Sequence, residues 1–181
     1  MNIVFDWSGT LADDHLMSWK ITNQTLEYFK GKKISFDTYQ KEFVFPFEKF
    51  YSKYCPNKSI NNINTYFFKT YNSCGSKIKL FEGIPQLIQN LHSNNELYII
   101  STLDSALLKG LSVKGGIFTY FKKIIGNAAN KTEALKQLLN DDGLIPSETI
   151  FIGDMSHDIE SAKNLKIQSG GITFGYSNST T

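Results

Sequence analysis

The chain contains no arginine: all 19 basic residues among its 181 are lysines, and 17 acids leave a net charge of +2. Faces that bind nucleic acid are usually rich in arginine, because the planar guanidinium makes paired contacts with phosphates. The composition therefore argues against a nucleic-acid partner. It also means that a bound phosphate must be held by lysine, backbone amides, hydroxyl groups or a metal ion.

Long apolar runs are missing as well. No stretch approaches the roughly 18 apolar residues of a membrane span, which predicts no membrane partner. The first ten residues, MNIVFDWSGT, have an acid at position six instead of the basic start of a signal peptide, so we expect a cytoplasmic protein. Cys55 and Cys74 are the only cysteines and have no other ligand-type neighbours. They predict free thiols rather than disulfides or a metal site.

What the chain does contain is a recurring apolar segment that ends in small or polar residues. NIVFD at 2–6, ELYIIST at 96–102 and ETIFIGD at 148–154 have this form. Each is typical of a buried parallel strand followed by a helix. The alternation predicts an α/β fold, a doubly wound parallel sheet with its chemistry at the carboxyl ends of the strands.

Helical spacing and end signals locate the intervening helices. We expect them at 83–94, at 131–143 with Gly143 just beyond the last turn, and at 156–165 with Ser156 as N-cap. A last strand is expected at 170–174.

Residues 15–80 differ in composition, being rich in Phe, Tyr, Lys and Asn. We interpret them as a small helical insertion after the first strand, between core segments 1–14 and 81–181. A helical lobe of this size needs its own core, so its aromatic residues are expected to be mainly core residues rather than ligand contacts. The aromatics in question are Phe43, Phe45, Phe47, Phe50, Tyr51 and Tyr54.

Three acids follow the predicted strands. Asp6 comes directly after the first strand, Asp154 follows a later one, and Asp158 lies one helical turn further on. Carboxylates gathered at one sheet edge repel each other unless a cation neutralises them, and oxygen ligands select Mg²⁺. The pattern predicts a magnesium site.

Groups that suit a phosphate lie at the same edge. Ser101 and Thr102 end the second strand and offer hydroxyls and amides, while Lys131 at a helix start adds a cation. Metal, nucleophile, hydroxyl and lysine together are typical of phosphoryl transfer.

The chain resembles the haloacid dehalogenase superfamily over residues 2–14 and roughly 80–176. FDWSGTLADD is similar to the first motif, DxDGT, and YIIST to the second, a strand ending in Ser or Thr. Lys131 fits the third motif and FIGDMSHDIESAKNL the fourth, GDxxxD. LFEGIPQLIQNL also resembles a helix of phosphoglycolate phosphatase-like members. The resemblance implies a Rossmann-like core with a helical cap after the first strand.

The resemblance also implies roles for individual residues. Asp6 would attack phosphorus, and Mg²⁺ would be held by Asp6, the backbone carbonyl of Ser8 and Asp154, with Asp158 as a further carboxylate.

Phosphate contacts are implied in the same way. Thr10 and Ser101 would hydrogen-bond the transferring phosphoryl group, and Lys131 would neutralise its charge.

Ser8 departs from the motif, which has an acid/base aspartate there. A serine hydroxyl is a poor proton shuttle near pH 7, so we expect slow turnover that depends on the leaving group. Asp13, Asp14 and His15 follow closely and include groups able to move a proton, although His15 is expected at the surface. His157 occupies a free position of the fourth motif and is also expected on a helix surface.

The leading hypothesis is a Mg²⁺-dependent phosphatase of a small phosphorylated metabolite, acting as a monomer or homodimer. One alternative is cleavage of a carbon–halogen or carbon–phosphorus bond. The first needs an arginine that the chain lacks, and the second needs a cap lysine, for which Lys20, Lys30, Lys32 and Lys33 are available. Another is a catalytically weak module that binds a phosphate ligand or a protein.

Overall fold

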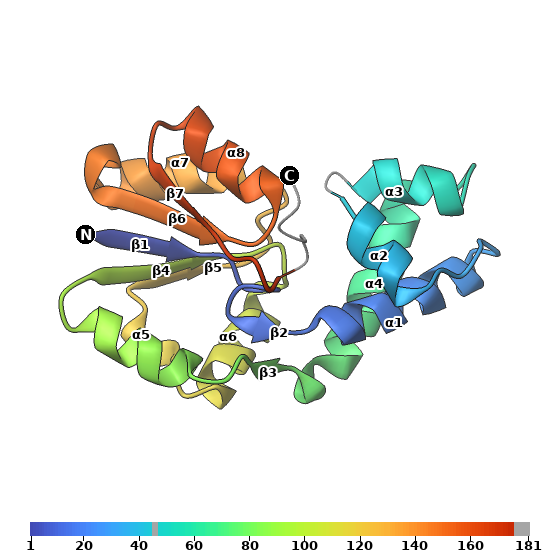
Figure 1. The fold of residues 1–181 in the computed structure, drawn as a ribbon, viewed down its shortest axis with the longest axis horizontal. Coiled ribbons are helices and arrows are strands. Elements are labelled where there is room, and N and C mark those ends of the chain that lie inside the picture. Colours follow the sequence, from blue (N-terminus) through green and yellow to red (C-terminus); the bar gives the residue numbers. More distant parts are fainter. Residues whose placement is uncertain (45–46, 176–181) are drawn as a thin grey trace.

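The computed structural model describes residues 1–44 and 47–175, so the aromatic Phe45 lies outside the described residues. Figure 1 shows a sheet flanked by helices and, beside it, a separate group of helices. The strands are β1 Asn2–Phe5, β2 Ala12–Asp13, β3 Lys79–Leu80, β4 Glu96–Ile100, β5 Lys123–Ile125, β6 Thr149–Gly153 and β7 Gln168–Gly171. The α-helices are α1 His15–Tyr28, α2 Phe36–Glu42, α3 Phe47–Tyr54, α4 Ile60–Cys74, α5 Ile84–His92, α6 Ser105–Lys114, α7 Lys131–Asp141 and α8 Ser156–Asn164.

The main sheet has the order β5-β4-β1-β6-β7, and every neighbouring pair in it is parallel. This confirms the predicted α/β class. β1 is the central strand, because Phe5 pairs with Ile99 of β4 on one side and with Ile152 of β6 on the other. The residues that follow β1, β4 and β6 therefore meet at one edge of the sheet.

Two local predictions differ from the structure. The last strand is Gln168–Gly171 rather than 170–174, because pairing with Ile150–Gly153 of β6 decides where the ladder lies. The N-cap of α8 is Met155 rather than Ser156, since the Met155 amide donates to the Asp158 carboxylate. Gly143 does follow α7 with a φ of 63°, as its predicted place beyond the helix end requires.

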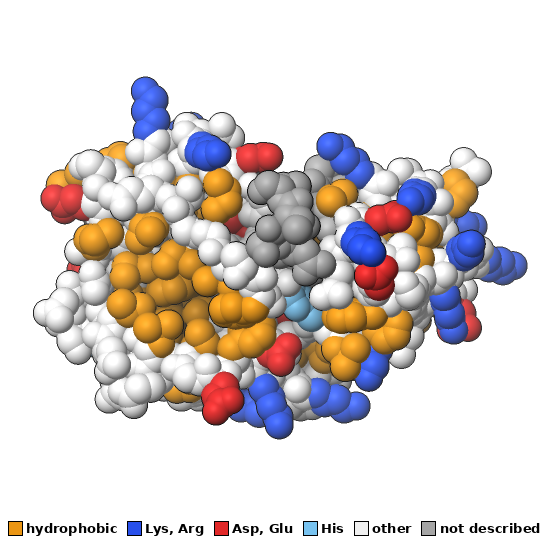
Figure 2. Space-filling model, in the orientation of Figure 1, with side chains coloured by type: hydrophobic (Ala, Val, Ile, Leu, Met, Phe, Trp, Pro, Cys, Tyr) orange, Lys and Arg blue, Asp and Glu red, His pale blue; other side chains and the backbone are white. Residues whose placement is uncertain are grey.

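Alternating strand residues build a core on each face of the sheet. Ile3 and Phe5 pack on the side of α5 and α6, whereas Val4 packs on the side of α7 and α8. This alternation follows from the two-residue period of a strand. Figure 2 shows hydrophobic side chains gathered on the core between α5 and β7. Among the exposed apolar residues are Leu87 of α5 and Phe174, whose ring lies 4.9 Å from that of Phe81.

Helices α1 to α4 pack around a cluster of their own, which includes Leu26, Phe50, Tyr51 and Ile63. Phe50 and Tyr51 are buried, as predicted for core aromatics. Phe43, Phe47 and Tyr54 are half-buried and pack against the same cluster.

A short antiparallel pair joins this helical insertion to the core (Figure 1). In that pair Ala12 of β2 faces Leu80 of β3, and Asp13 faces Lys79. The chain thus enters and leaves the insertion side by side. Cys55 and Cys74 are free thiols, as predicted. Of the helices in the described ranges, none combines the length and apolarity that a membrane crossing requires.

Candidate active site

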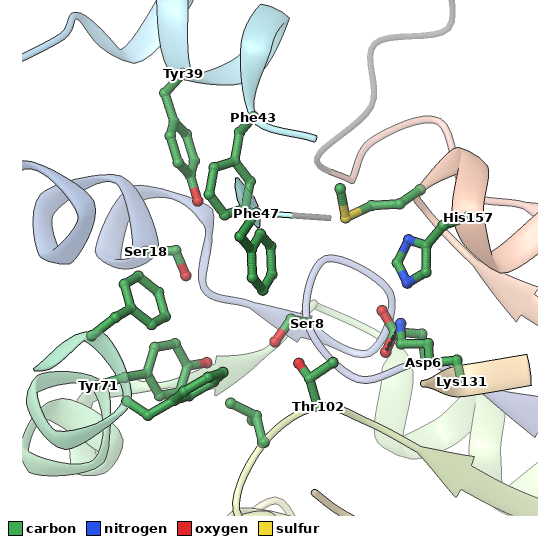
Figure 3. A pocket seen from close by; sticks show the side chains of 14 residues that line it. Asp6, Ser8, Ser18, Tyr39, Phe43, Phe47, Tyr71, Thr102, Lys131 and His157 are labelled. Atoms are coloured by element: carbon green, nitrogen blue, oxygen red, sulfur yellow. Dashed lines mark ion pairs between the residues drawn. The ribbon is translucent and has the colours of Figure 1, made fainter. Parts of the chain in front are cut away.

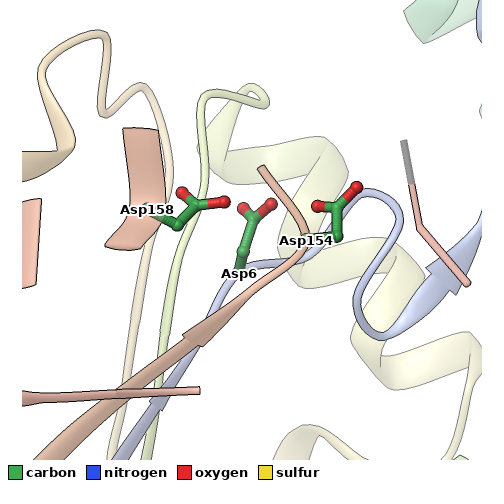
Figure 4. Close-up of side chains that lie close together, drawn as sticks. All are labelled: Asp6, Asp154 and Asp158. Carbon is green, nitrogen blue, oxygen red and sulfur yellow. The ribbon is translucent and has the colours of Figure 1, made fainter. Parts of the chain in front are cut away.

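Three aspartates gather at the carboxyl edge of the sheet. Oxygen atoms of Asp6, Asp154 and Asp158 all lie within 4.8 Å of one another, and each residue is buried. Figure 4 shows Asp6 between the other two, with the three carboxylates drawn together. The convergence predicted from the strand ends is therefore present.

The sequence after β1 fixes where Asp6 lies. Its amide donates to the carbonyl of Ile152 at 2.8 Å, which continues the strand pairing by one residue. A tight turn then begins, in which the carbonyl of Trp7 accepts from the amides of Thr10, Leu11 and Ala12. Gly9 has a φ of 75°, a left-handed conformation that glycine adopts without steric cost. The turn leaves Ser8 at the rim of the site.

Lys131, the first residue of α7, lies between two of the acids. Its Nζ is 2.8 Å from Asp6 Oδ1 and 2.7 Å from Asp158 Oδ1, and its side chain is only 4% exposed. Burial disfavours the charged ammonium, but the charges of Asp6 and Asp158 outweigh burial and raise the pKa of Lys131 above its ordinary value. Lysine 131 is therefore a permanent cation in this site.

For Asp6, burial outweighs the charge of the neighbouring lysine. Burial raises the pKa of Asp6 to about 7, Lys131 opposes this shift, and the charge of Asp158 adds to it. Three buried carboxylates near one ammonium leave an excess of negative charge that bulk solvent screens poorly. The site as it stands favours a further cation.

Asp158 is held by contacts to both of its oxygens. Oδ1 accepts from Lys131 and Oδ2 accepts from the Met155 amide at 3.1 Å. Gly153 makes room for it, because a Cβ at that position would lie 2.5 Å from the Asp158 carboxyl carbon. Glycine at the end of β6 thus lets the acid of α8 approach the sheet.

The hydroxyl residues named from the sequence lie at different depths. Thr10 is buried, and its Oγ1 donates to Asp154 Oδ1 at 3.4 Å. Ser101 is also buried, and its Oγ accepts from the Leu103 amide at 3.2 Å. Thr102 lines the cavity that contains Asp6, whereas Ser101 is not among the described residues that line it.

That cavity has a volume of about 60 Å³ and lies between the core and the insertion. Figure 3 shows Asp6, Ser8 and Thr102 on the core side, facing Tyr39, Phe43 and other cap side chains. The described cap residues that line it are Ser18, Tyr39, Phe43, Phe47, Phe67, Phe68 and Tyr71. Aromatic residues of the insertion therefore serve both its own core and the cavity.

Two wider clefts share lining residues with this cavity. One of about 500 Å³ shares Phe47, Phe68 and Thr102 with it, and the other of about 600 Å³ shares Lys131 and His157. The acidic site therefore borders on larger spaces on two sides.

Both histidines expected at the surface belong to the site region. His15 is 9% exposed, and its Nε2 lies 4.0 Å from Asp154 Oδ2. His157 lines the cavity, with Nε2 3.4 Å from Asp158 Oδ1. Burial lowers the pKa of each to about 4. The surface predictions were wrong because the insertion packs over this edge of the sheet, which the helical pattern of each segment does not reveal.

Sequence reasoning also missed Tyr71. This α4 residue is 1% exposed, and its hydroxyl donates to Asp14 Oδ2. Burial and the neighbouring Asp14 raise the pKa of Tyr71 well above its ordinary value, and the Ser8 side chain opposes this rise. Tyr71 is one of nine tyrosines in the chain and belongs to no motif, so only the packing of the insertion could show its place.

A parallel sheet with three aspartates at its carboxyl edge, beneath a helical insertion, defines the class of the protein as a capped α/β protein with a candidate metal site at the strand ends. The chain belongs to the haloacid dehalogenase-like hydrolases, since the model of that family matches residues 3–172.

Similar proteins agree with this assignment. Pyrophosphatase PpaX of Listeria welshimeri is 27% identical over 191 residues, covering 95% of this chain and 82% of that protein. Phosphoglycolate phosphatase of Vibrio vulnificus is 26% identical over 113 residues, covering 59% of this chain and 50% of that protein.

A solved haloacid dehalogenase-like hydrolase from Streptococcus pneumoniae has the same fold. Its TM-score is 0.87 at 24% identity, over 98% of this chain and 87% of that one.

Proposed function

We propose that the protein is a Mg²⁺-dependent phosphatase that acts on a small phosphorylated metabolite through an aspartyl-phosphate intermediate on Asp6. The observation that carries the proposal is the position of Asp6, paired with Lys131 and adjacent to Asp154 and Asp158 at the sheet edge. In this proposal residues 1–14 and 81–181 form the catalytic core and residues 15–80 the cap.

The donor set fits a magnesium ion. Three buried carboxylates within 4.8 Å offer only oxygen atoms, which Mg²⁺ prefers, and Lys131 balances one of their charges. Asp6, Asp154 and the backbone carbonyl of Ser8 would hold the ion, with Asp158 as a further carboxylate. A bound Mg²⁺ supplies positive charge next to the phosphate oxygens.

Residues of the chain itself have separate roles in the reaction. A carboxylate oxygen of Asp6 forms a bond to phosphorus, while the bond from phosphorus to the leaving oxygen breaks. Thr10 and Ser101 orient the phosphoryl group and Lys131 offsets its charge, in the role that preorganised donors have in phosphoryl transfer. Water then cleaves the aspartyl phosphate and restores Asp6. Thr102, in the cavity wall, is a further contact for the substrate phosphate.

The relatives support phosphate chemistry in general terms, since the two named above are a pyrophosphatase and a phosphoglycolate phosphatase. The phosphonate alternative gains no support, because Lys131 is the one lysine in the described lining of the central cavity, and it belongs to the core. The halide alternative still lacks an arginine.

The test is phosphate release from 4-nitrophenyl phosphate with and without Mg²⁺, for the native protein and Asp6→Asn. We expect release that needs both the ion and Asp6. The matched control is Asp141→Asn, which removes an exposed acid of α7 and should leave the rate unchanged. A native protein that binds Mg²⁺ and releases no phosphate would refute the proposal and favour a binding role.

A further inference from the structure

The cavity beside Asp6 is too small for a whole substrate. Its volume is about 60 Å³, whereas pockets that hold small molecules usually measure about 300–1,000 Å³. The part of the substrate that departs as the leaving group must therefore extend into a neighbouring space. The two wider clefts that border the cavity differ in the chemistry of their linings.

The cleft of about 500 Å³ is the better continuation of the cavity. It shares Thr102 with the cavity, and Thr102 follows β4 at the edge where the strand ends meet. Figure 3 shows the Phe47 ring pointing from the cap toward this part of the core. The cleft of about 600 Å³ instead shares Lys131, and the ion pairs of Lys131 with Asp6 and Asp158 occupy that side of the cavity. We call the first space the α4 cleft, because residues of that helix form its cap wall.

The cap wall of the α4 cleft combines two amides with an aromatic ring. Asn64, Phe68 and Asn72 all line it, and they are spaced four residues apart along α4. Residues with this spacing lie on one face of a helix. Asn64 and Phe68 are half-buried and Asn72 is exposed, and within the described residues neither amide side chain has a hydrogen-bond partner. The wall therefore offers amide donors and acceptors on both sides of a ring that can pack against an apolar surface.

The core wall of the α4 cleft adds further neutral polar groups. Thr102 contributes a hydroxyl that is both donor and acceptor. Asn127 donates from its amide nitrogen to Ser105 Oγ at 3.1 Å, so its carbonyl oxygen is left to accept from a ligand. Neutral donors and acceptors on both walls suit a ligand that carries hydroxyl groups.

The charges of the α4 cleft are of one sign. Glu48 of α3 and Asp104, which caps α6, are its charged residues, and none of the described residues that line it is a lysine or a histidine. An anionic leaving group would lie near these carboxylates without a cation to offset the repulsion. Pyrophosphate and phosphoglycolate both release an anion, so neither suits this cleft.

We propose that the α4 cleft selects a leaving group that is an uncharged ring carrying hydroxyl groups, the chemistry that sugar phosphates and nucleoside monophosphates share. Phe68 packs against a face of the ring, while Asn64, Asn72 and Thr102 hydrogen-bond its hydroxyls. These side chains determine which phosphate ester is hydrolysed, and the reaction at Asp6 is the same for every ester. The inference rests on the phosphatase function proposed above.

The first experiment measures kcat and KM of the native protein with Mg²⁺ for four substrates. They are glucose 6-phosphate, adenosine 5′-monophosphate, pyrophosphate and phosphoglycolate, with 4-nitrophenyl phosphate as a reference that has no hydroxyl group. We expect kcat/KM for at least one of the two ring substrates to exceed that for both anion-releasing substrates by about tenfold or more. Whichever ring substrate has the higher value identifies the source of the ring as a sugar or a nucleoside.

Substitutions in the cap wall then locate the contacts. Asn64→Ala and Asn72→Ala should each raise the KM of the preferred ring substrate about two- to tenfold relative to that of 4-nitrophenyl phosphate, as expected for one neutral hydrogen bond. Asn72→Lys puts a cation into the cleft and should raise kcat/KM for phosphoglycolate roughly fivefold at low salt, a gain that high salt removes. The matched control is Asn62→Ala, an exposed asparagine of α4 that is not among the described lining residues, and it should change neither constant.

Three outcomes would overturn the assignment of the α4 cleft. They are a protein that hydrolyses pyrophosphate or phosphoglycolate as efficiently as both ring substrates, equal effects of Asn72→Ala and Asn62→Ala, or a rise in KM confined to Asn164→Ala in the other cleft. Each of them is observed in a protein that hydrolyses 4-nitrophenyl phosphate, so each refutes the substrate class alone. A protein that releases no phosphate from any of these compounds would refute the phosphatase function itself.

Discussion

Removing the charge of Asp6 should stabilise the metal-free protein even as it abolishes activity. Asp6, Asp154 and Asp158 are buried around a single ammonium, and burial raises the pKa of Asp6 from 3.8 to about 7. Each pKa unit corresponds to about 1.4 kcal/mol, so ionised Asp6 costs at most about 4 kcal/mol above pH 7. Asparagine resembles the neutral acid but adds an amide donor beside Lys131. We therefore expect Asp6→Asn to increase the free energy of unfolding by about 2 kcal/mol, which is half of that limit.

The raised pKa of Asp6 also predicts how the stability of the protein depends on pH. Between about pH 4 and 7 the folded protein binds a proton at Asp6 that the unfolded chain releases. Stability of the native protein relative to Asp6→Asn therefore falls as the pH rises through this window. The difference in unfolding free energy in favour of Asp6→Asn should reach its full value above pH 7 and should disappear near pH 4.

Thermal unfolding in EDTA measures this effect. At pH 8 the melting temperature of Asp6→Asn should exceed that of the native protein by roughly 4–8 °C, the shift expected for about 2 kcal/mol in a chain of this size. Millimolar Mg²⁺ should raise the native value and narrow the gap, since a ligand of the folded state stabilises it. An Asp6→Asn variant that melts at or below the native temperature in EDTA at pH 8 would show that the carboxylates do not repel each other as argued.

Other substitutions test other parts of the site. Lys131→Met leaves the buried carboxylates of Asp6 and Asp158 without their ammonium, which should cost about 3–5 kcal/mol in urea unfolding; a loss below 1 kcal/mol would contradict the pairing. Gly153→Ala places a Cβ 2.5 Å from the Asp158 carboxyl carbon, so calorimetry should find Mg²⁺ binding weakened about tenfold, and native affinity would argue against Asp158 as a ligand. Ser8→Asp should raise hydrolysis of an alkyl phosphate by about 10²-fold and of an aryl phosphate much less, and equal gains would show that leaving-group protonation is not limiting.

The sheet and the acidic edge could be predicted because their signals are local. Each apolar strand is a continuous run, and Asp6 and Asp154 follow such runs directly. Parallel pairing then brings their side chains together without further information. The two-residue strands β2 and β3 carry too short a pattern to be recognised before the fold is known.

The cap side of the site could not be predicted in the same way. Tyr71 and His157 are spaced like other residues of their helices, and only the packing of the insertion on the core makes them cavity residues. Asp14 was recognised as a nearby acid, but its partner lies 57 positions away in the sequence. Tertiary contacts of this kind produce no periodic pattern in the sequence from which they could be predicted.

The side-by-side entry and exit of the insertion also affects the order of folding. Asn2 of the central strand must meet Glu96 and Thr149, so closing the sheet from an unfolded chain means closing long loops. Helices α1 to α4 lie within residues 15–74 and pack largely on one another. When they assemble first and β2 pairs with β3, the first of those loops shortens to segments 6–11 and 81–95 on either side of the pair, which reduces the entropy lost on closure. The insertion would then act as a folding aid that brings β1 and β4 together, and a chain whose insertion stays unfolded would form its sheet more slowly.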